Sequence, residues 1–177
     1  FIDLKTQYAE LKDEIDAHIH SVLDGQAFIQ GPEVKELEEA LATFSGAKRV
    51  VTCANGTDAL QLALMALGIG SGDAVFVPSF TYTATAEVIL LLGARPVFVD
   101  SDIDTFNIDF ASAEAAIEKT KAQGALRPAA LMTVDLFGMP VDYDAARALA
   151  DRHGLAFISD AAQGFGGNFK GQRVGSG

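Results

Sequence analysis

The chain has 177 residues, of which 49% are hydrophobic, and this is enough for one domain with a sizeable core. With 13 Lys and Arg against 24 Asp and Glu, the formal net charge of -11 argues against a nucleic-acid partner, which would need clustered positive charge. The single cysteine, Cys53, leaves no internal disulfide, and no apolar run is long enough to span a bilayer or serve as a secretion signal. We therefore expect a cytoplasmic protein without a membrane partner.

Two helices are predicted at the start of the chain. Apolar residues at spacings of three and four along residues 4–23 predict an amphipathic helix that ends near Gly25. The next helix begins at Pro32, which suits a first helical position, and Gly46 suits its C-terminal cap. We interpret residues 1–46 as an N-terminal helical segment.

From residue 49 onward, short apolar runs alternate with helical patterns. The predicted strands cover residues 49–54, 74–77, 96–99, 129–134 and 156–159. The predicted helices cover residues 57–67, 83–92, 112–122 and 142–153, and a surface hairpin is predicted at 167–173. Continuously apolar strands separated by helices imply a parallel sheet that is covered on both faces. The predicted fold class is therefore α/β, with three α/β/α layers around a mostly parallel sheet.

The end of the first predicted strand carries the tetrapeptide Asn55-Gly56-Thr57-Asp58. In open parallel sheets, ligands bind at the carboxyl ends of the strands, where loops and helix N-termini converge. Free backbone N–H groups and the positive end of the helix dipole favour a phosphate there, Gly56 allows close approach, and the Thr57 hydroxyl adds a donor. The alternative is that Asn55 or Thr57 only caps the helix.

Two further strand ends carry unusual residues. The segment from Pro78 to Tyr82 places an aromatic ring at the same edge, where Tyr82 would either stack on a flat cofactor or simply pack against the protein. Asp160 follows a buried strand, and a carboxylate there needs a cationic partner, such as a pyridinium nitrogen, unless it is an ordinary helix cap or ion-pair partner. A phosphate cup, a ring platform and an anion beside the ring nitrogen are together what pyridoxal 5'-phosphate requires.

The motifs at these strand ends resemble those of the DegT/DnrJ/EryC1/StrS family of pyridoxal-phosphate-dependent sugar aminotransferases. The resemblance implies an aspartate-aminotransferase-like fold, known as fold type I, and covers nearly the whole chain. Besides the motifs above, it rests on Phe1-Ile2-Asp3-Leu4, Gly31-Pro32-Glu33-Val34, Ala84-Thr85-Ala86 and Asp160-Ala161-Ala162-Gln163.

The resemblance also implies a role for five residues. Gly56 and Thr57 would hold the cofactor phosphate, and Tyr82 would stack on the pyridine ring. Asp160 would pair with the ring nitrogen as a catalytic residue, and Gln163 would hydrogen-bond the ring hydroxyl.

The function implied by the family is amino transfer, with glutamate as the expected donor, to a nucleotide-linked keto sugar. The closest likeness is to enzymes that act on UDP-linked 3-keto sugars of surface polysaccharide pathways. The family further implies a homodimer with active sites at the subunit interface, to which residues 26–32 would contribute from the partner.

Three other functions are weighed against this one. A pyridoxamine-phosphate-dependent sugar dehydratase would have a histidine at the position of the family's lysine. A non-catalytic regulator or binding module would use the same fold without turnover. A nicotinamide-nucleotide enzyme would need a G-x-G-x-x-G fingerprint after the first strand, and residues 54–59 lack it.

The family's Schiff-base lysine is expected beyond Gly177. The chain's lysines fall on predicted solvated helix faces, in the predicted hairpin or outside the family's lysine position, and they are Lys5, Lys12, Lys35, Lys48, Lys119, Lys121 and Lys170. We therefore expect residues 47–177 to be the first part of the cofactor-binding large domain, with the C-terminal small domain absent from this sequence.

The chain departs from the family pattern at three positions near the motifs. Ser159 stands where the family usually has an acidic residue, Gly164 where it often has Ser, and Asp135 where Ser or His is typical near the substrate. No metal site is expected, because His18, His20 and His153 form no cluster with Cys53 in the sequence. Cys53 itself is predicted to be a small buried residue of an apolar strand.

Overall fold

A four-stranded parallel sheet forms the centre of the protein in the computed structural model, which describes residues 2–176. Phe1, the first residue of the Phe1-Ile2-Asp3-Leu4 motif, lies outside the described residues. So does Gly177, the last residue of the predicted large-domain part at 47–177. The strand order is β2-β1-β3-β4. The strands are β1 (Asp73–Pro78), β2 (Arg95–Val99), β3 (Arg127–Val134) and β4 (Ala156–Asp160).

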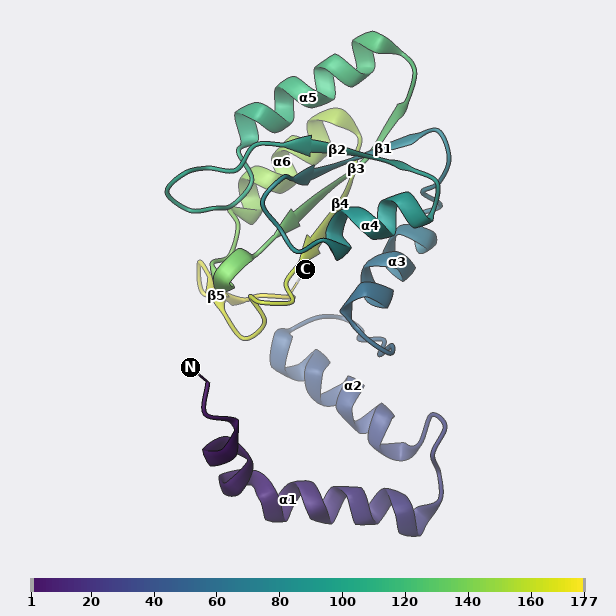
Figure 1. Ribbon diagram of the computed structural model, residues 1–177, viewed down its shortest axis with the longest axis vertical. Helices are drawn as coiled ribbons and strands as arrows, with labels where there is room; N and C mark the ends of the chain where they lie inside the picture. The colour runs from purple at the N-terminus through teal and green to yellow at the C-terminus, as the bar shows by residue number, and fades with distance from the viewer. Residues whose placement is uncertain (1, 177) are drawn as a thin grey trace.

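Helices cover both faces of this sheet, as the sequence predicts (Figure 1). One face packs against α3 (Gly56–Ala66) and α4 (Ala84–Leu91). The other packs against α5 (Phe110–Gln123) and α6 (Tyr143–His153). The three-layer α/β/α prediction is confirmed.

Alternate side chains of the central strands supply the two cores. In β1, Phe76 points to the α5 and α6 side, while Val75 and Val77 point to the α3 and α4 side, and all three are fully buried. In β3, Leu131 and Met132 divide between the two faces in the same way. Burial of each such side chain contributes roughly 1.5–3 kcal/mol.

The strand order places the carboxyl ends of β1 and β3 side by side at a switch point. The chain leaves β1 through α4 to reach β2 on one side, and then returns through α5 to β3 on the other side of β1. The segments that follow β1 and β3 therefore leave toward opposite faces. This divergence opens a crevice at the carboxyl ends of β1 and β3, and open α/β sheets bind their ligands in such a crevice.

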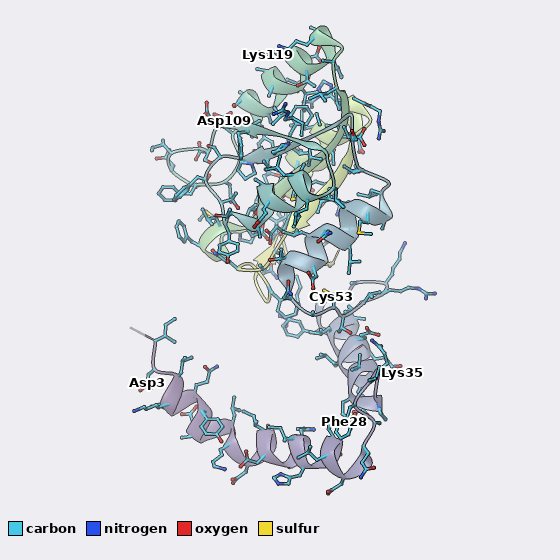
Figure 2. The ribbon with its side chains drawn as sticks, turned by 45° about the vertical axis from the view of Figure 1, so that its right-hand side comes forward. Asp3, Phe28, Lys35, Cys53, Asp109 and Lys119 are labelled. Atoms are coloured by element: carbon cyan, nitrogen blue, oxygen red, sulfur yellow. The ribbon has the colours of Figure 1, made fainter. Side chains whose placement is uncertain are left out.

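The first two helices, α1 (Leu4–Gly25) and α2 (Pro32–Ser45), lie outside the three layers (Figure 1). Their boundaries match the predicted ones, and Gly46 takes the left-handed conformation of a C-terminal cap. α1 buries no residue against the rest of residues 2–176. Figure 2 shows α1, and Phe28 beyond its end, lying apart from the sheet and the helices that cover it. None of the helices in the described part combines the length and apolar character needed to cross a membrane.

The predicted hairpin is also confirmed, as β5 (Asn168–Phe169) paired antiparallel with β6 (Gln172–Arg173). Its two turn residues, Lys170 and Gly171, both have positive φ, as a tight two-residue turn requires. A short 3-10 helix, η1 (Leu136–Gly138), follows β3 and was not predicted.

The predicted strand at residues 49–54 is wrong. The segment pairs with no strand within residues 2–176, and Val51 is 84% exposed. A run of β-branched residues forms a strand only if a neighbouring backbone offers a hydrogen-bonding edge. For the same reason Cys53 is exposed rather than buried, and its thiol contacts the Asn55 carbonyl at 3.2 Å.

Candidate active site

One cavity of about 220 Å³ lies at the carboxyl ends of the strands, and it collects all five predicted cofactor-binding residues. Three separate stretches of the chain supply them: the start of α3, the loop before α4 and the segment after β4. The other lining residues are mostly apolar. The complete lining is Gly56, Thr57, Leu60, Tyr82, Ala84, Val134, Leu136, Asp160, Ala162 and Gln163.

The N-terminus of α3 opens into this cavity with unused donors. The Asn55 side chain caps the helix by accepting from the Asp58 N–H at 2.9 Å. Because that cap is Asn55, the backbone N–H groups of Gly56 and Thr57 have no intrahelical acceptor. The Thr57 hydroxyl also makes no hydrogen bond within the described chain, and a Cβ placed on Gly56 would meet no atom within 4 Å. This open cradle of donors fits a phosphate.

Tyr82 presents its ring at the rim of the cavity. Its residue surface is 71% exposed, and its ring is paired with no other aromatic ring in residues 2–176. The packing alternative weighed from the sequence therefore does not account for its position. An uncovered ring beside a phosphate cradle suits a flat aromatic ligand.

Asp160 is partly buried at the end of β4 and meets no cation among the described residues. Its Oδ2 accepts from the Thr85 hydroxyl at 3.3 Å, and its Oδ1 accepts from the Ala162 N–H at 3.2 Å. It is neither a helix cap nor an ion-pair partner there, which removes the two ordinary explanations for this carboxylate. Its chemistry fits a cationic nitrogen supplied by a ligand.

The Gln163 amide is oriented by the backbone of η1. Its Oε1 accepts from the Phe137 N–H at 2.6 Å, and Phe137 has a left-handed backbone with φ 56°. With the oxygen used in this way, the amide keeps its Nε2 group as a donor. A donor at this position fits the ring hydroxyl of pyridoxal phosphate.

Asp135, whose position is near the substrate in the family pattern, does not line this cavity. It is fully buried, and it faces α6 on the opposite side of the sheet. Its Oδ1 accepts from the Val141 N–H at 3.0 Å, and its Oδ2 accepts from the Tyr143 hydroxyl. A strand alternates its side chains between faces, so Asp135 and Val134 point to opposite sides. Asp135 therefore anchors the segment that follows β3.

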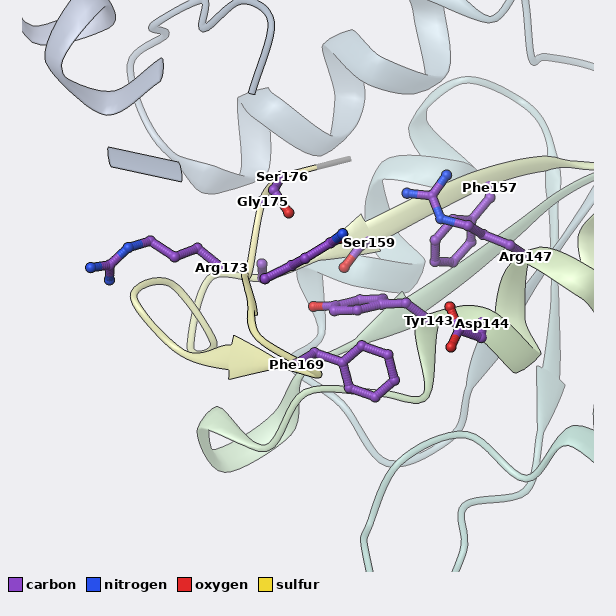
Figure 3. Close-up of a pocket in the computed structure, with 11 residues that line it drawn as sticks. Tyr143, Asp144, Arg147, Phe157, Ser159, Phe169, Arg173, Gly175 and Ser176 are labelled. Atoms are coloured by element: carbon purple, nitrogen blue, oxygen red, sulfur yellow. The ribbon is translucent and has the colours of Figure 1, made fainter. Parts of the chain in front are cut away.

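A second cavity of about 140 Å³ lies along the outer side of β4 (Figure 3). Tyr143, Ser159 and Phe169 line it, and none of the five predicted cofactor-binding residues does. Burial and the bond to Asp135 raise the pKa of Tyr143. Ser159 and Asp135, two of the departures from the family pattern, thus meet around one tyrosine rather than at the candidate active site.

Burial raises the pKa of the Asp135 carboxyl above its usual 3.8, and the negative charge of Asp160 adds to the effect, although the bonds from Tyr143 and Val141 oppose it. A carboxyl with a raised folded-state pKa stabilises the protein fully below pH 3.8, and this contribution is lost as the pH rises through the raised value. We expect the stability of wild type relative to Asp135→Asn to fall over that window by about 1.4 kcal/mol per unit of pKa increase. Urea unfolding at several pH values measures this difference, and a constant or rising difference would contradict the expectation.

Within residues 2–176, no lysine lines the candidate active site, and all seven lysines of the chain are exposed. Lys35 and Lys119 lie on outer helix surfaces (Figure 2). Lys170, in the hairpin, pairs with Asp144 at 2.5 Å.

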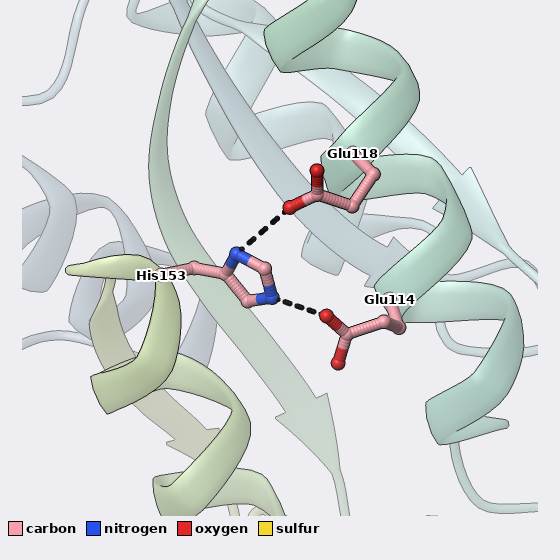
Figure 4. A group of neighbouring side chains, drawn as sticks. All are labelled: Glu114, Glu118 and His153. Atoms are coloured by element: carbon pink, nitrogen blue, oxygen red, sulfur yellow. Dashed lines mark hydrogen bonds and ion pairs between the residues drawn. The ribbon is translucent and has the colours of Figure 1, made fainter.

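A cluster that sequence reasoning missed joins α5 to α6 (Figure 4). His153 lies between Glu114 and Glu118, with ring nitrogens 2.5 Å and 3.3 Å from their carboxylates. Arg152 also pairs with Glu114, and its bond is the main reason that the pKa of Glu114 is lowered. Arg152 balances Glu114, and Lys121 pairs with Glu118 at 3.2 Å, so we interpret the cluster as an ion-pair and hydrogen-bond link between two helices. Only the packing of α5 on α6 reveals it.

Comparison with known proteins gives closely similar sequences and structures. The chain is 53% identical over 173 residues to the UDP-2-acetamido-2-deoxy-3-oxo-D-glucuronate aminotransferase of Pseudomonas aeruginosa, covering 98% of this chain and 46% of that protein. The crystal structure of a DegT DnrJ EryC1 StrS aminotransferase from Brucella abortus is 51% identical, with a TM-score of 0.92 over 94% of this chain and 44% of that one. The PLP-form of Spr1654 from Streptococcus pneumoniae is 32% identical, with a TM-score of 0.76 over 90% of this chain and 44% of that one.

The chain thus spans a little under half the length of the relatives that it matches. The family model described as the DegT/DnrJ/EryC1/StrS aminotransferase family matches residues 9–177. The shared fold is the fold type I architecture that the motifs imply. This chain belongs to the DegT/DnrJ/EryC1/StrS aminotransferase family.

Proposed function

We propose that the protein binds pyridoxal 5'-phosphate in the cavity at the strand ends and transfers an amino group, from glutamate, to a nucleotide-linked keto sugar. The observation that carries the proposal is the convergence of Thr57, Tyr82, Asp160 and Gln163 on one cavity, from stretches that are distant in sequence. The PLP-form of the Streptococcus pneumoniae relative supports the choice of cofactor.

Each side chain would hold a different part of the cofactor. The free N–H groups of Gly56 and Thr57 at the start of α3 would bind the phosphate, with the helix dipole adding to the attraction. Tyr82 would cover one ring face, Asp160 would accept a hydrogen bond from the protonated ring nitrogen, and Gln163 would donate to the ring hydroxyl. When bound, the cofactor supplies an electron sink, and Asp160 makes that sink effective by keeping a positive charge on the ring.

A UDP-linked 3-keto sugar is the substrate that we propose. The Pseudomonas aeruginosa relative is named as an aminotransferase of a UDP-linked 3-oxo sugar, and its 53% identity covers nearly the whole chain. Surface polysaccharide synthesis is the corresponding proposed context. The cytoplasmic location and the division of the chain at residue 46 stay predictions.

A homodimer is the assembly that we propose, and the exposed face of α1 supports it. Six large apolar side chains at helical spacing lie on α1 and each is 38–66% exposed: Leu4, Tyr8, Leu11, Ile15, Ile19 and Leu23. A stripe of this kind is normally buried against another element, and a second copy of the chain would cover it. Residues 26–32, which follow this helix, would then lie near the partner's active site.

The test uses the full-length protein and pyridoxal phosphate. We expect a new visible absorption band at a stoichiometry of one per chain, bleached by glutamate and restored by a UDP-linked 3-keto sugar as the amino acceptor. No band at all would contradict cofactor binding. A band that glutamate does not bleach would instead support a dehydratase or a binding protein of the same fold.

A further inference from the structure

Thr85 is a buried hydroxyl residue whose contacts lead directly to the candidate active site. It lies in the first turn of α4 and is 0% exposed. Its Oγ1 lies 3.3 Å from Asp160 Oδ2, although 75 residues separate the two in sequence. It does not line the cavity itself, so any effect on a ligand passes through Asp160.

The direction of this hydrogen bond follows from the donors that are present. An ionised carboxylate only accepts, so the Thr85 hydroxyl donates its single proton to Asp160. The hydroxyl of Thr81 lies 3.0 Å from that of Thr85. Because the Thr85 proton is already used, Thr81 donates to Thr85. The hydrogen bonds therefore run in one direction from Thr81 through Thr85 to Asp160.

The two oxygens of Asp160 are held from different sides. Thr85 on α4 binds Oδ2, and the Ala162 N–H of the segment after β4 binds Oδ1 at 3.2 Å. Two donors on two separate elements fix the plane of the carboxylate as well as its position. Each oxygen retains a lone pair that can accept from a third donor in the cavity.

We infer that Thr85 is a positioning residue that orients the Asp160 carboxylate toward the ring nitrogen of the cofactor. The inference rests on the proposed function, since it assigns a role toward the proposed cofactor. If the Thr85 hydroxyl is removed, Asp160 Oδ2 loses its hydrogen-bond donor. The carboxylate is then held only by the hydrogen bond from the Ala162 N–H to Oδ1, and it can rotate. The carboxylate then spends less time in the orientation that lets it accept a hydrogen bond from the ring nitrogen.

The test compares three variants of the full-length protein. Thr85→Val has nearly the same shape but no hydroxyl, and Thr85→Ser restores the hydroxyl. Thr83→Val is the matched control, because Thr83 is exposed and its side chain makes no capping hydrogen bond. We expect turnover to fall about tenfold in Thr85→Val, as the loss of one hydrogen bond to a charged group implies, and by less than about twofold in the other two variants.

Two further measurements separate positioning from a merely structural role. The ¹⁵N NMR shift of labelled pyridoxal phosphate reports whether its ring nitrogen is protonated, and we expect a reduced protonated fraction only in Thr85→Val. Crystal structures of cofactor-free Thr85→Val and Thr85→Ser should show the Asp160 carboxylate rotated in the first and unchanged in the second.

A protonated nitrogen and an unrotated Asp160 in Thr85→Val would overturn the inference, even if that variant melts at a lower temperature. If wild type binds no pyridoxal phosphate, the proposed function fails separately. The two cofactor-free crystal structures then decide by themselves whether Thr85 orients Asp160.

Discussion

The Asp160→Asn variant of the full-length protein is expected to lose on the order of 10³-fold in turnover. Asparagine keeps the shape of the side chain but removes the negative charge that we propose faces the ring nitrogen. Asp160 meets no cation among residues 2–176, so its charge is left for the ligand. Affinity for pyridoxal phosphate should fall far less, because we propose that the phosphate is bound by Gly56 and Thr57, which line the same cavity from a different element.

Stopped-flow measurement of the half-reaction with glutamate, together with a cofactor titration, separates these two effects. Asp151→Asn is a suitable control, since Asp151 is an exposed aspartate on α6 that lies outside the cavity. An Asp160→Asn variant with unchanged turnover would show that the catalytic role of Asp160 is misassigned. An equal loss in cofactor affinity and turnover would point to a binding role alone.

Gly164→Ala is expected to destabilise the full-length protein by about 2–3 kcal/mol. A Cβ at Gly164 would lie 2.6 Å from Asp135 Oδ2 and 2.7 Å from Asp135 Cβ. Asp135 cannot move aside easily, because Val141 and Tyr143 both donate to its carboxylate in a fully buried position. Urea unfolding measures the loss, with Gly70→Ala as the control, since a Cβ there would meet nothing closer than 3.6 Å.

The clash also predicts a coupling between positions 135 and 164. Asp135→Gly removes both the carboxylate and the Cβ that the new methyl group would strike, so the double variant should lose less stability than the sum of the two single variants. Additive losses would contradict the proposed contact. In this chain the close approach of Asp135 leaves no room for a side chain at position 164.

Most of the secondary structure could be predicted from the pattern of the sequence. The run at 74–77 is apolar at every position and the run at 129–134 at every position but Thr133, and only a sheet covered on both faces buries such runs completely. The cavity could be predicted as well, because the carboxyl ends of neighbouring parallel strands meet at one edge. Tyr82 and Asp160 lie at or after such strand ends, whereas Thr57 follows the run at 49–54, which forms no strand here, and the structure nevertheless brings the three residues together.

The tertiary structure decided what depends on a partner that is distant in the chain. The run at 49–54 has the composition of a strand but finds no pairing edge within the described residues, and a strand is not stable by itself. Asp135 follows β3 and Asp160 ends β4, the neighbouring strand, yet one serves as an internal anchor and the other lines the cavity. The contacts of Thr85 with Asp160 and of His153 with Glu114 join residues 75 and 39 positions apart. Local periodicity determines which element a residue joins, whereas the face that its side chain meets depends on how the layers pack.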